Sequence, residues 1–126
     1  MRIYLIHPIS GLSAEQVFGY YDGIEAVLKP AGWTVLSPML GKDYLRKEYS
    51  GRSFPTEGYK HPVASNHAIV ERDVWMVQQA DVVYADLVGV QEKSIGCTSE
   101  LAWAHLLCKH AVVAMDEGNS HQHSFI

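Results

Sequence analysis

The chain has 126 residues, of which 48% are hydrophobic and 19% charged, and its formal net charge is −4. This length suits one domain with a sizeable core and leaves no room for a second, while the composition excludes wholesale disorder. The negative charge gives no general attraction for nucleic-acid phosphates, so any related ligand is expected to be a small molecule and not a polymer.

The amino-terminal stretch has the features of neither a signal peptide nor a membrane span. Its apolar run at residues 3–6 is too short and is stopped by His7-Pro8, and no other run reaches the length of a span. Cys97 and Cys108 lie eleven residues apart in a segment predicted to be one helix, a spacing too long for a disulfide. We therefore expect reduced thiols, a cytoplasmic location and no membrane partner.

Short apolar runs alternate with segments of helical period. The runs are predicted to be strands at residues 2–6, 33–36, 82–85 and 111–115. Helices are predicted between them at residues 14–28, 64–80 and 98–109, the first with Ser13 and Gln16 as a capping box. This order predicts an α/β fold over residues 1–126, with a doubly wound, flavodoxin-like or Rossmann-like parallel sheet flanked by helices.

In such a sheet, ligands bind at the carboxyl ends of the strands. We therefore looked for chemistry after Ile6, Leu36, Ala85 and Met115. Residues 40–63 are polar, aromatic and rich in Gly and Pro without a sustained period, so they are predicted to be a functional or mobile loop.

Asp73 interrupts an apolar helical stripe, because it follows Ile69 and Val70 and precedes Met76 and Val77 at helical spacing. A carboxylate facing a core is costly unless it is paired or used. The spacing alone leaves a rim position or a structural salt bridge equally open.

Glu100 is predicted to lie in the first turn of the third helix, with Thr98 as the N-cap. There the helix dipole would favour an ionised carboxylate, which could act as a nucleophile at an acetal-like carbon. Ser94 and Gly96 just before it would allow an anion or a sugar hydroxyl to approach the backbone. An acid at this position is also simply a good helix starter, and that alternative remains open.

Three further sets of side chains have weaker signals. Asp86 ends the third strand, where it could bind a ligand or cap a turn, and Tyr4 lies mid-strand, where core tyrosines are common. The seven histidines include no set at a recognisable metal-ligand spacing, so no metal site is predicted.

Taken together, three segments resemble the nucleoside 2-deoxyribosyltransferase family, which includes the 2′-deoxynucleoside 5′-monophosphate N-glycosidases. They are the run Ile3-Tyr4-Leu5-Ile6-His7-Pro8-Ile9, the run from Glu71-Arg72-Asp73 to Asp81–Asp86, and Ser94-Ile95-Gly96-Cys97-Thr98-Ser99-Glu100-Leu101-Ala102-Trp103-Ala104. The resemblance implies that Glu100 attacks C1′ of the deoxyribose, that Tyr4 orients Glu100, and that Asp73 protonates the departing base. An apolar surround would raise the pKa of Asp73, while the helix start would keep Glu100 charged.

The same resemblance implies substrate contacts from the loop after the first strand and from the carboxyl edge of the sheet. The residues concerned are His7, Ile9, Asp86, Ser94, Gly96 and Asn119. His7-Pro8 replaces the Gly-Pro common in the family, which alters the base-stacking loop. Asn119 resembles an Asn of the transferases that reaches a neighbouring subunit's site, which implies a homo-oligomer with shared active sites.

The expected function is a nucleoside 2-deoxyribosyltransferase that acts on a deoxynucleoside and a free nucleobase, without a cofactor. Ser94 departs from the transferases, which often have an Asp there to hold the 5′-hydroxyl, and matches the nucleotide N-glycosidases, whose Ser contacts the 5′-phosphate. A 5′-monophosphate N-glycosidase is therefore the first alternative. A non-catalytic nucleotide-binding module on the same fold is the second.

Overall fold

Four parallel strands form one sheet in the computed structural model, which describes residues 1–126. The strands are β1 (Arg2–Ile6), β2 (Thr34–Leu36), β3 (Val82–Asp86) and β4 (His110–Ala114), in the spatial order β2-β1-β3-β4. The strand order reverses beside β1, as a doubly wound topology requires. The predicted α/β fold is therefore confirmed, and the crevice that this topology favours lies at the carboxyl ends of β1 and β3.

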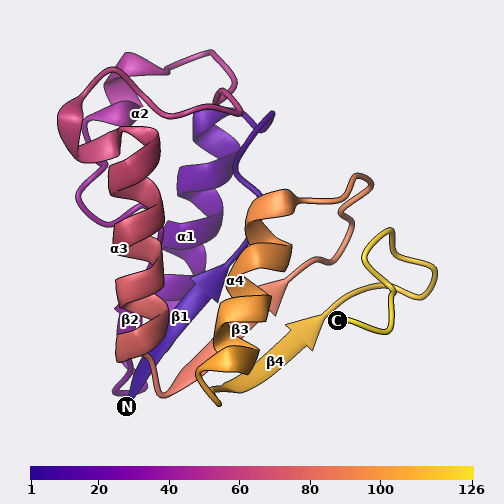
Figure 1. Ribbon diagram of the computed structural model, residues 1–126. Helices are drawn as coiled ribbons and strands as arrows, with labels where there is room; N and C mark the ends of the chain where they lie inside the picture. Colours follow the sequence, from indigo (N-terminus) through magenta and orange to yellow (C-terminus); the bar gives the residue numbers. More distant parts are fainter.

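Three longer helices connect these strands: α1 (Ala14–Leu28), α3 (Asn66–Gln79) and α4 (Ile95–Leu106). α1 begins with the predicted capping box, in which the Gln16 amide donates to Ser13 Oγ at 3.1 Å and the Ser13 amide donates to Gln16 Oε1 at 2.9 Å. Figure 1 shows α3 and α4 in front of the sheet and α1 behind it.

Each face of the sheet has its own apolar core, because successive side chains of a strand point to opposite faces. On the α1 face, Ile3 and Leu5 pack against Val17, Phe18 and Tyr21. On the other face, Tyr4 and Ile6 of β1 join residues of α3 and α4, namely Met76, Val77, Cys97, Leu101 and Ala104. The alternation within β1 thus sends Tyr4 to the face that α3 and α4 cover.

Several sequence predictions need correction. α4 begins at Ile95 with Ser94 as its N-cap, so Thr98 is not the cap and Glu100 lies in the second turn. Cys108 lies beyond the end of α4. Val70, expected on the buried stripe of α3, is 46% exposed.

Residues 40–63, predicted as a loop, contain the one-turn helix α2 (Leu45–Glu48), and the 3-10 turn η1 (Pro62–Ala64) follows at their end. Leu45 and Phe54 in this segment are buried against the α1 face of the sheet. None of the helices has the length and hydropathy that a membrane crossing requires.

Candidate active site

Tyr4 and Glu100 meet inside the layer formed by the sheet and α4. The Tyr4 hydroxyl donates to Glu100 Oε1 at 2.5 Å, a short hydrogen bond. Tyr4 is fully buried and Glu100 is 8% exposed. Tyr4 is thus a core residue, as its mid-strand position suggested, and its hydroxyl also holds one carboxyl oxygen of Glu100 in place.

Asp73 faces the same region from α3 and is 7% exposed. Its Oδ1 atom is buried and has no hydrogen-bond partner. A buried polar atom without a partner costs about 1–3 kcal/mol, which makes Asp73 a candidate for a role in binding or catalysis. No salt bridge joins Asp73 to Arg72, so the structural explanation considered for this residue lacks its main support.

The pKa of Asp73 agrees with the sequence prediction, whereas the pKa of Glu100 does not. Burial raises the pKa of Asp73 to about 6, as expected, against the opposing charges of Lys42 and Arg72. Burial also raises the pKa of Glu100 to about 8, and the Asp73 carboxylate adds to this rise. The expectation that the helix start would keep Glu100 charged is therefore wrong, because a residue in the second turn has no access to the free amides of the first.

Lys42 is a site residue that the sequence did not reveal. It is only 3% exposed, and its charge lowers the pKa of both Asp73 and Glu100. Burial in turn lowers the pKa of Lys42 to about 8. The available signal was its place in a Gly-Lys turn shortly after the second strand, where the fold rule puts ligands, but an isolated lysine in a long loop is usually solvated.

His7 and Tyr20 form an aromatic pair at the carboxyl end of β1. Their rings stack with centroids 3.8 Å apart, and His7 Nδ1 lies 3.0 Å from the Asp86 carbonyl oxygen. The Asp86 carboxylate accepts from the Val88 amide at 3.2 Å, as in a turn cap. Ile9 is half-buried and packs against the α1-face core. Substrate contacts at His7, Ile9 and Asp86 stay predictions.

The C-terminal tail holds the start of α4. Ser94 Oγ caps the helix by accepting from the Cys97 amide at 3.3 Å, and the Ser94 amide donates to His121 Nε2 at 2.8 Å. Asn119 donates to the carbonyls of Leu87 at 2.8 Å and Val90 at 3.3 Å. The side chain of Asn119 is thus engaged within its own chain, while its predicted reach into a neighbouring subunit's site, and substrate contacts at Ser94 and Gly96, stay predictions.

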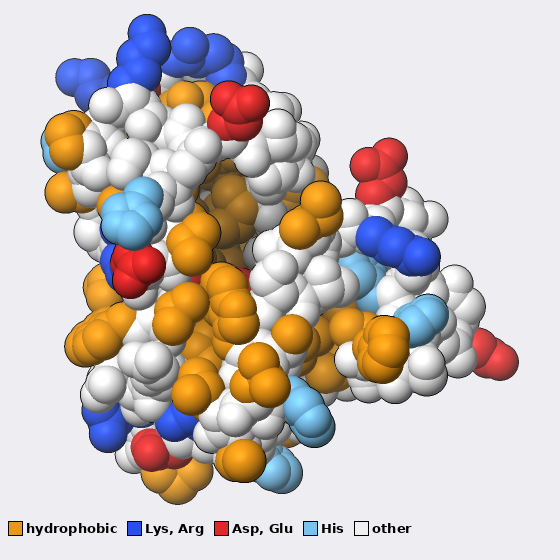
Figure 2. Space-filling view, viewed as in Figure 1, with side chains coloured by type: hydrophobic (Ala, Val, Ile, Leu, Met, Phe, Trp, Pro, Cys, Tyr) orange, Lys and Arg blue, Asp and Glu red, His pale blue; other side chains and the backbone are white.

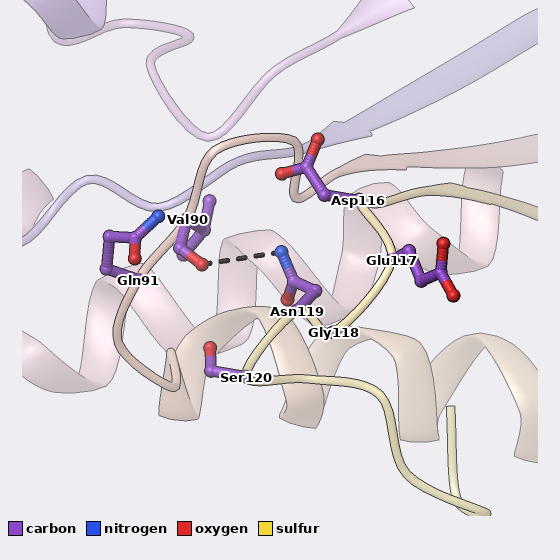
Figure 3. Close-up of a pocket in the computed structure, with 7 residues that line it drawn as sticks. All are labelled: Val90, Gln91, Asp116, Glu117, Gly118, Asn119 and Ser120. Carbon is purple, nitrogen blue, oxygen red and sulfur yellow. Dashed lines mark hydrogen bonds between the residues drawn. The ribbon is translucent and has the colours of Figure 1, made fainter.

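Two hollows differ in character. Figure 2 shows the surface hollowed between α4 and the part of the molecule formed by α3 and the loop above it, with hydrophobic side chains at the bottom. A second, polar hollow of about 280 Å³ lies beside the tail, and Figure 3 shows its lining residues Val90, Gln91, Asp116, Glu117, Gly118, Asn119 and Ser120. The carboxyl pair is not among these lining residues. No group of three or more His, Cys, Asp or Glu side chains is arranged to hold a metal ion.

Two solved structures share this architecture. A 2-desoxiribosyltransferase from Leishmania mexicana superposes with a TM-score of 0.63 at 21% identity, covering 90% of this chain and 63% of that one. The CMP N-glycosidase BcmB from Clostridium botulinum superposes with a TM-score of 0.59 at 18% identity, covering 93% of this chain and 73% of that one. The chain has the fold of these two enzymes.

This likeness confirms the resemblance seen in the sequence at the level of the fold. The chain spans less than two thirds of the length of the Leishmania mexicana enzyme. No family model and no curated protein sequence matches it.

Proposed function

We propose that this chain belongs to the nucleoside 2-deoxyribosyltransferase family and cleaves the N-glycosidic bond of 2′-deoxynucleosides. One observation carries the proposal: a buried carboxyl, Glu100, is fixed by the Tyr4 hydroxyl beside a second buried carboxyl, Asp73, that has an unpartnered oxygen. Paired carboxyls with separate environments are the usual equipment for breaking a glycosidic bond in two displacements.

In the first displacement, a Glu100 oxygen forms a bond to C1′ and the bond from C1′ to the base nitrogen breaks. The electron pair of that bond goes to the base nitrogen, and Asp73 supplies the proton that the nitrogen takes up. In the second displacement, the nitrogen of another base attacks C1′, Asp73 takes its proton, and Glu100 leaves as a carboxylate. Tyr4 favours this cycle because its hydroxyl stabilises the ionised form of Glu100.

The reactive form has Asp73 protonated and Glu100 ionised. With a pKa of about 6 for Asp73 and about 8 for Glu100, the pair holds a single proton between these two values. That proton can lie on Asp73, which is the reactive arrangement, or on Glu100. The two arrangements have the same total charge. Binding of a base beside Asp73 would favour the arrangement with the proton on Asp73, because the base nitrogen provides the hydrogen-bond partner that Asp73 lacks.

Base exchange tests the proposed transferase directly. We expect that the chain, given 2′-deoxyinosine and free adenine, forms 2′-deoxyadenosine, and that mass spectrometry detects a 2-deoxyribosyl adduct on Glu100. Glu100→Gln is expected to lose both, whereas the matched change Glu92→Gln, at an exposed position in the preceding loop, keeps both. An adduct on another residue would refute the assignment of the nucleophile.

Hydrolysis of 2′-deoxynucleoside 5′-monophosphates is the alternative, and Ser94 at the start of α4 favours it. Its hydroxyl and the neighbouring amides lie where a helix accepts an anion. Release of free base and deoxyribose 5-phosphate from monophosphates alone, with no exchange, would replace the transferase by this hydrolase.

We further propose that the chain forms a homo-oligomer. Large apolar side chains are exposed on both helices of one face, with Val70 at 46% and Trp75 at 51% on α3, and Leu106 at 77% on α4. Hydrophobic side chains gather over these two helices in Figure 2. Size-exclusion chromatography tests this: a fully active monomer would refute both the oligomer and any role of Asn119 in a neighbouring site.

A further inference from the structure

Three side chains with donor groups gather near the proposed acid: the charges of Lys42 and Arg72 act on Asp73, and Tyr44 lies near Arg72. Arg72 uses one nitrogen, Nη1, to donate to the Val63 carbonyl at 2.9 Å, while its Nε and Nη2 atoms are buried without a partner. The Tyr44 hydroxyl is likewise buried without a partner. Lys42 is 3% exposed and makes no ion pair. Arg72 and Tyr44 therefore have donor groups that their own chain does not satisfy, and Lys42 adds a buried charge beside them.

The fold brings these donors together from two directions. After β2, the Met39 amide donates to Ser37 Oγ at 3.1 Å and the Lys42 amide donates to the Met39 carbonyl at 2.9 Å, which turns the chain back over the carboxyl end of the sheet. Tyr44 then packs on His61, with ring centroids 5.1 Å apart. Arg72 and Asp73 approach from α3, whose first turns lie against η1.

Buried donors without partners are unfavourable in the free protein and become favourable when a ligand supplies acceptors. Two parts of a nucleotide present acceptor oxygens: the carbonyls of an oxo-bearing base and the phosphate. A phosphate dianion beside two carboxyls would be repelled, whereas a carbonyl oxygen is neutral in the substrate. It gains negative charge only as the bond to C1′ breaks, because the electron pair left on the base nitrogen delocalises onto it.

We propose that Lys42, assisted by Arg72 and Tyr44, binds a carbonyl oxygen of the leaving nucleobase, which makes oxo-bearing bases the preferred substrates. This inference rests on the proposed function and names the substrate class of the same site. The donors act most strongly in the transition state, so they select through the rate of base release. Adenine has an amino group, itself a donor, where hypoxanthine has a carbonyl, and it is therefore disfavoured.

The test compares 2′-deoxyinosine with 2′-deoxyadenosine, which differ in the carbonyl or amino group of this position and in the hydrogen on the neighbouring ring nitrogen. We expect the wild type to favour 2′-deoxyinosine in kcat/KM, and Lys42→Met to lower kcat/KM for 2′-deoxyinosine by about 10–100-fold with a much smaller loss for 2′-deoxyadenosine. Lys47→Met, the same change at an exposed position of α2, should leave the ratio unchanged. Because both rates come from one sample, the ratio does not depend on how much of the variant is folded.

Arg72→Gln provides a second variant, with a smaller change of the ratio in the same direction. An unchanged ratio in both variants would overturn this inference and leave the proposed function standing. The variants are also assayed with 2′-deoxyinosine 5′-monophosphate. A loss of kcat/KM confined to this substrate would assign the donors to the phosphate and would also overturn this inference. No base release by the wild type from any of these substrates would overturn the proposed function and this inference with it.

Discussion

Two polar regions lie at the carboxyl edge of the sheet, and their buried hydrogen-bonding atoms differ in whether they have partners. Around Asn119 and His121, the side-chain groups are joined to one another and to the backbone of the β3–α4 connection. Around Asp73, a carboxylate oxygen, two guanidinium nitrogens and a tyrosine hydroxyl have none. The first region is satisfied within the chain, whereas the second has buried donors and an acceptor without partners, as the proposed ligand site requires.

The polar hollow beside the tail and the carboxyl pair also differ in how open they are to solvent. The polar hollow beside the tail is lined by residues at the rim of the satisfied region, such as Glu117 and Gly118. The carboxyl pair is nearly closed, because Tyr4, Asp73 and Glu100 are all buried. The chemistry here is therefore indicated by unsatisfied and perturbed groups, and not by the volume of a cavity.

Among the variants that test the contrast between these two regions, Asp73→Asn should have the largest effect on activity. We expect kcat to fall by about 10²–10⁴-fold, since the variant has no proton to give to the base. The pH profile of kcat/KM should be bell-shaped in the wild type, with limbs near the pKa of about 6 and the pKa of about 8 of the carboxyl pair. In Asp73→Asn the alkaline limb should disappear, because only the ionisation of Glu100 then governs the rate. An unchanged profile would return Asp73 to a structural role.

Glu100→Gln should stabilise the fold in alkaline solution. The folded-state pKa of Glu100 is about 8 against an ordinary value of 4.5, so the folded chain keeps a proton that the unfolded chain releases between these values. This group therefore lowers the free energy of unfolding as the pH rises through that window. The neutral variant should gain roughly 2–4 kcal/mol relative to wild type at pH 9 and almost nothing at pH 4.5, as measured by urea unfolding.

Glu57→Gln, the same change at an exposed position, is the matched control and should alter stability little at either pH. An equal gain at pH 4.5 and pH 9 would mean that packing, and not the buried charge, explains the effect of Glu100→Gln.

His121→Ala should have the smallest effect on chemistry and a clear effect on stability. The loss of its ring leaves the Ser94 amide without its acceptor and removes one of the two His121 contacts to Asn119 Oδ1, which should cost about 1–3 kcal/mol of unfolding free energy. Burial lowers the pKa of His121 in the folded chain, so its contribution to stability is lost as the pH falls below the ordinary value of 6.5. The difference in unfolding free energy between wild type and variant should therefore shrink in acid.

His123→Ala, at an exposed position two residues further, is the matched control and should leave stability unchanged. If His121→Ala instead reduced base release as strongly as Asp73→Asn, the tail region would belong to the catalytic machinery and the contrast between the two regions would fail.

Much of the site could be predicted because its signals are local. Asp73 interrupts an apolar stripe, so its buried face follows from a fixed period of about 3.6 residues, and the strand that contains Tyr4 is visible as a short apolar run. The capping box of Ser13 and Gln16 is a local pattern as well, and it formed as predicted. The fold class followed from the order of these elements.

The predicted start of α4, with Thr98 as the N-cap, was wrong, because Ser is an equally good N-cap residue and Ser94 lies one turn earlier. Ser94 takes that position while its amide is held by His121 from the distant C-terminal tail. The Thr98 hydroxyl instead donates within the helix, to the Ile95 carbonyl at 2.9 Å. The N-cap that forms is thus accompanied by a contact between distant segments, which a local pattern does not reveal.

The sequence by itself determined the parallel α/β layers, the strand that contains Tyr4 and the unusual position of Asp73, because these depend on patterns of a few residues. Only the tertiary structure decided that Glu100 is buried in a second turn, that Lys42 lies beside both carboxyls, and that Asn119 and His121 are mutually satisfied. Burial and pairing of such polar groups depend on segments far apart in the chain. Their energies arise only when those segments exclude water together.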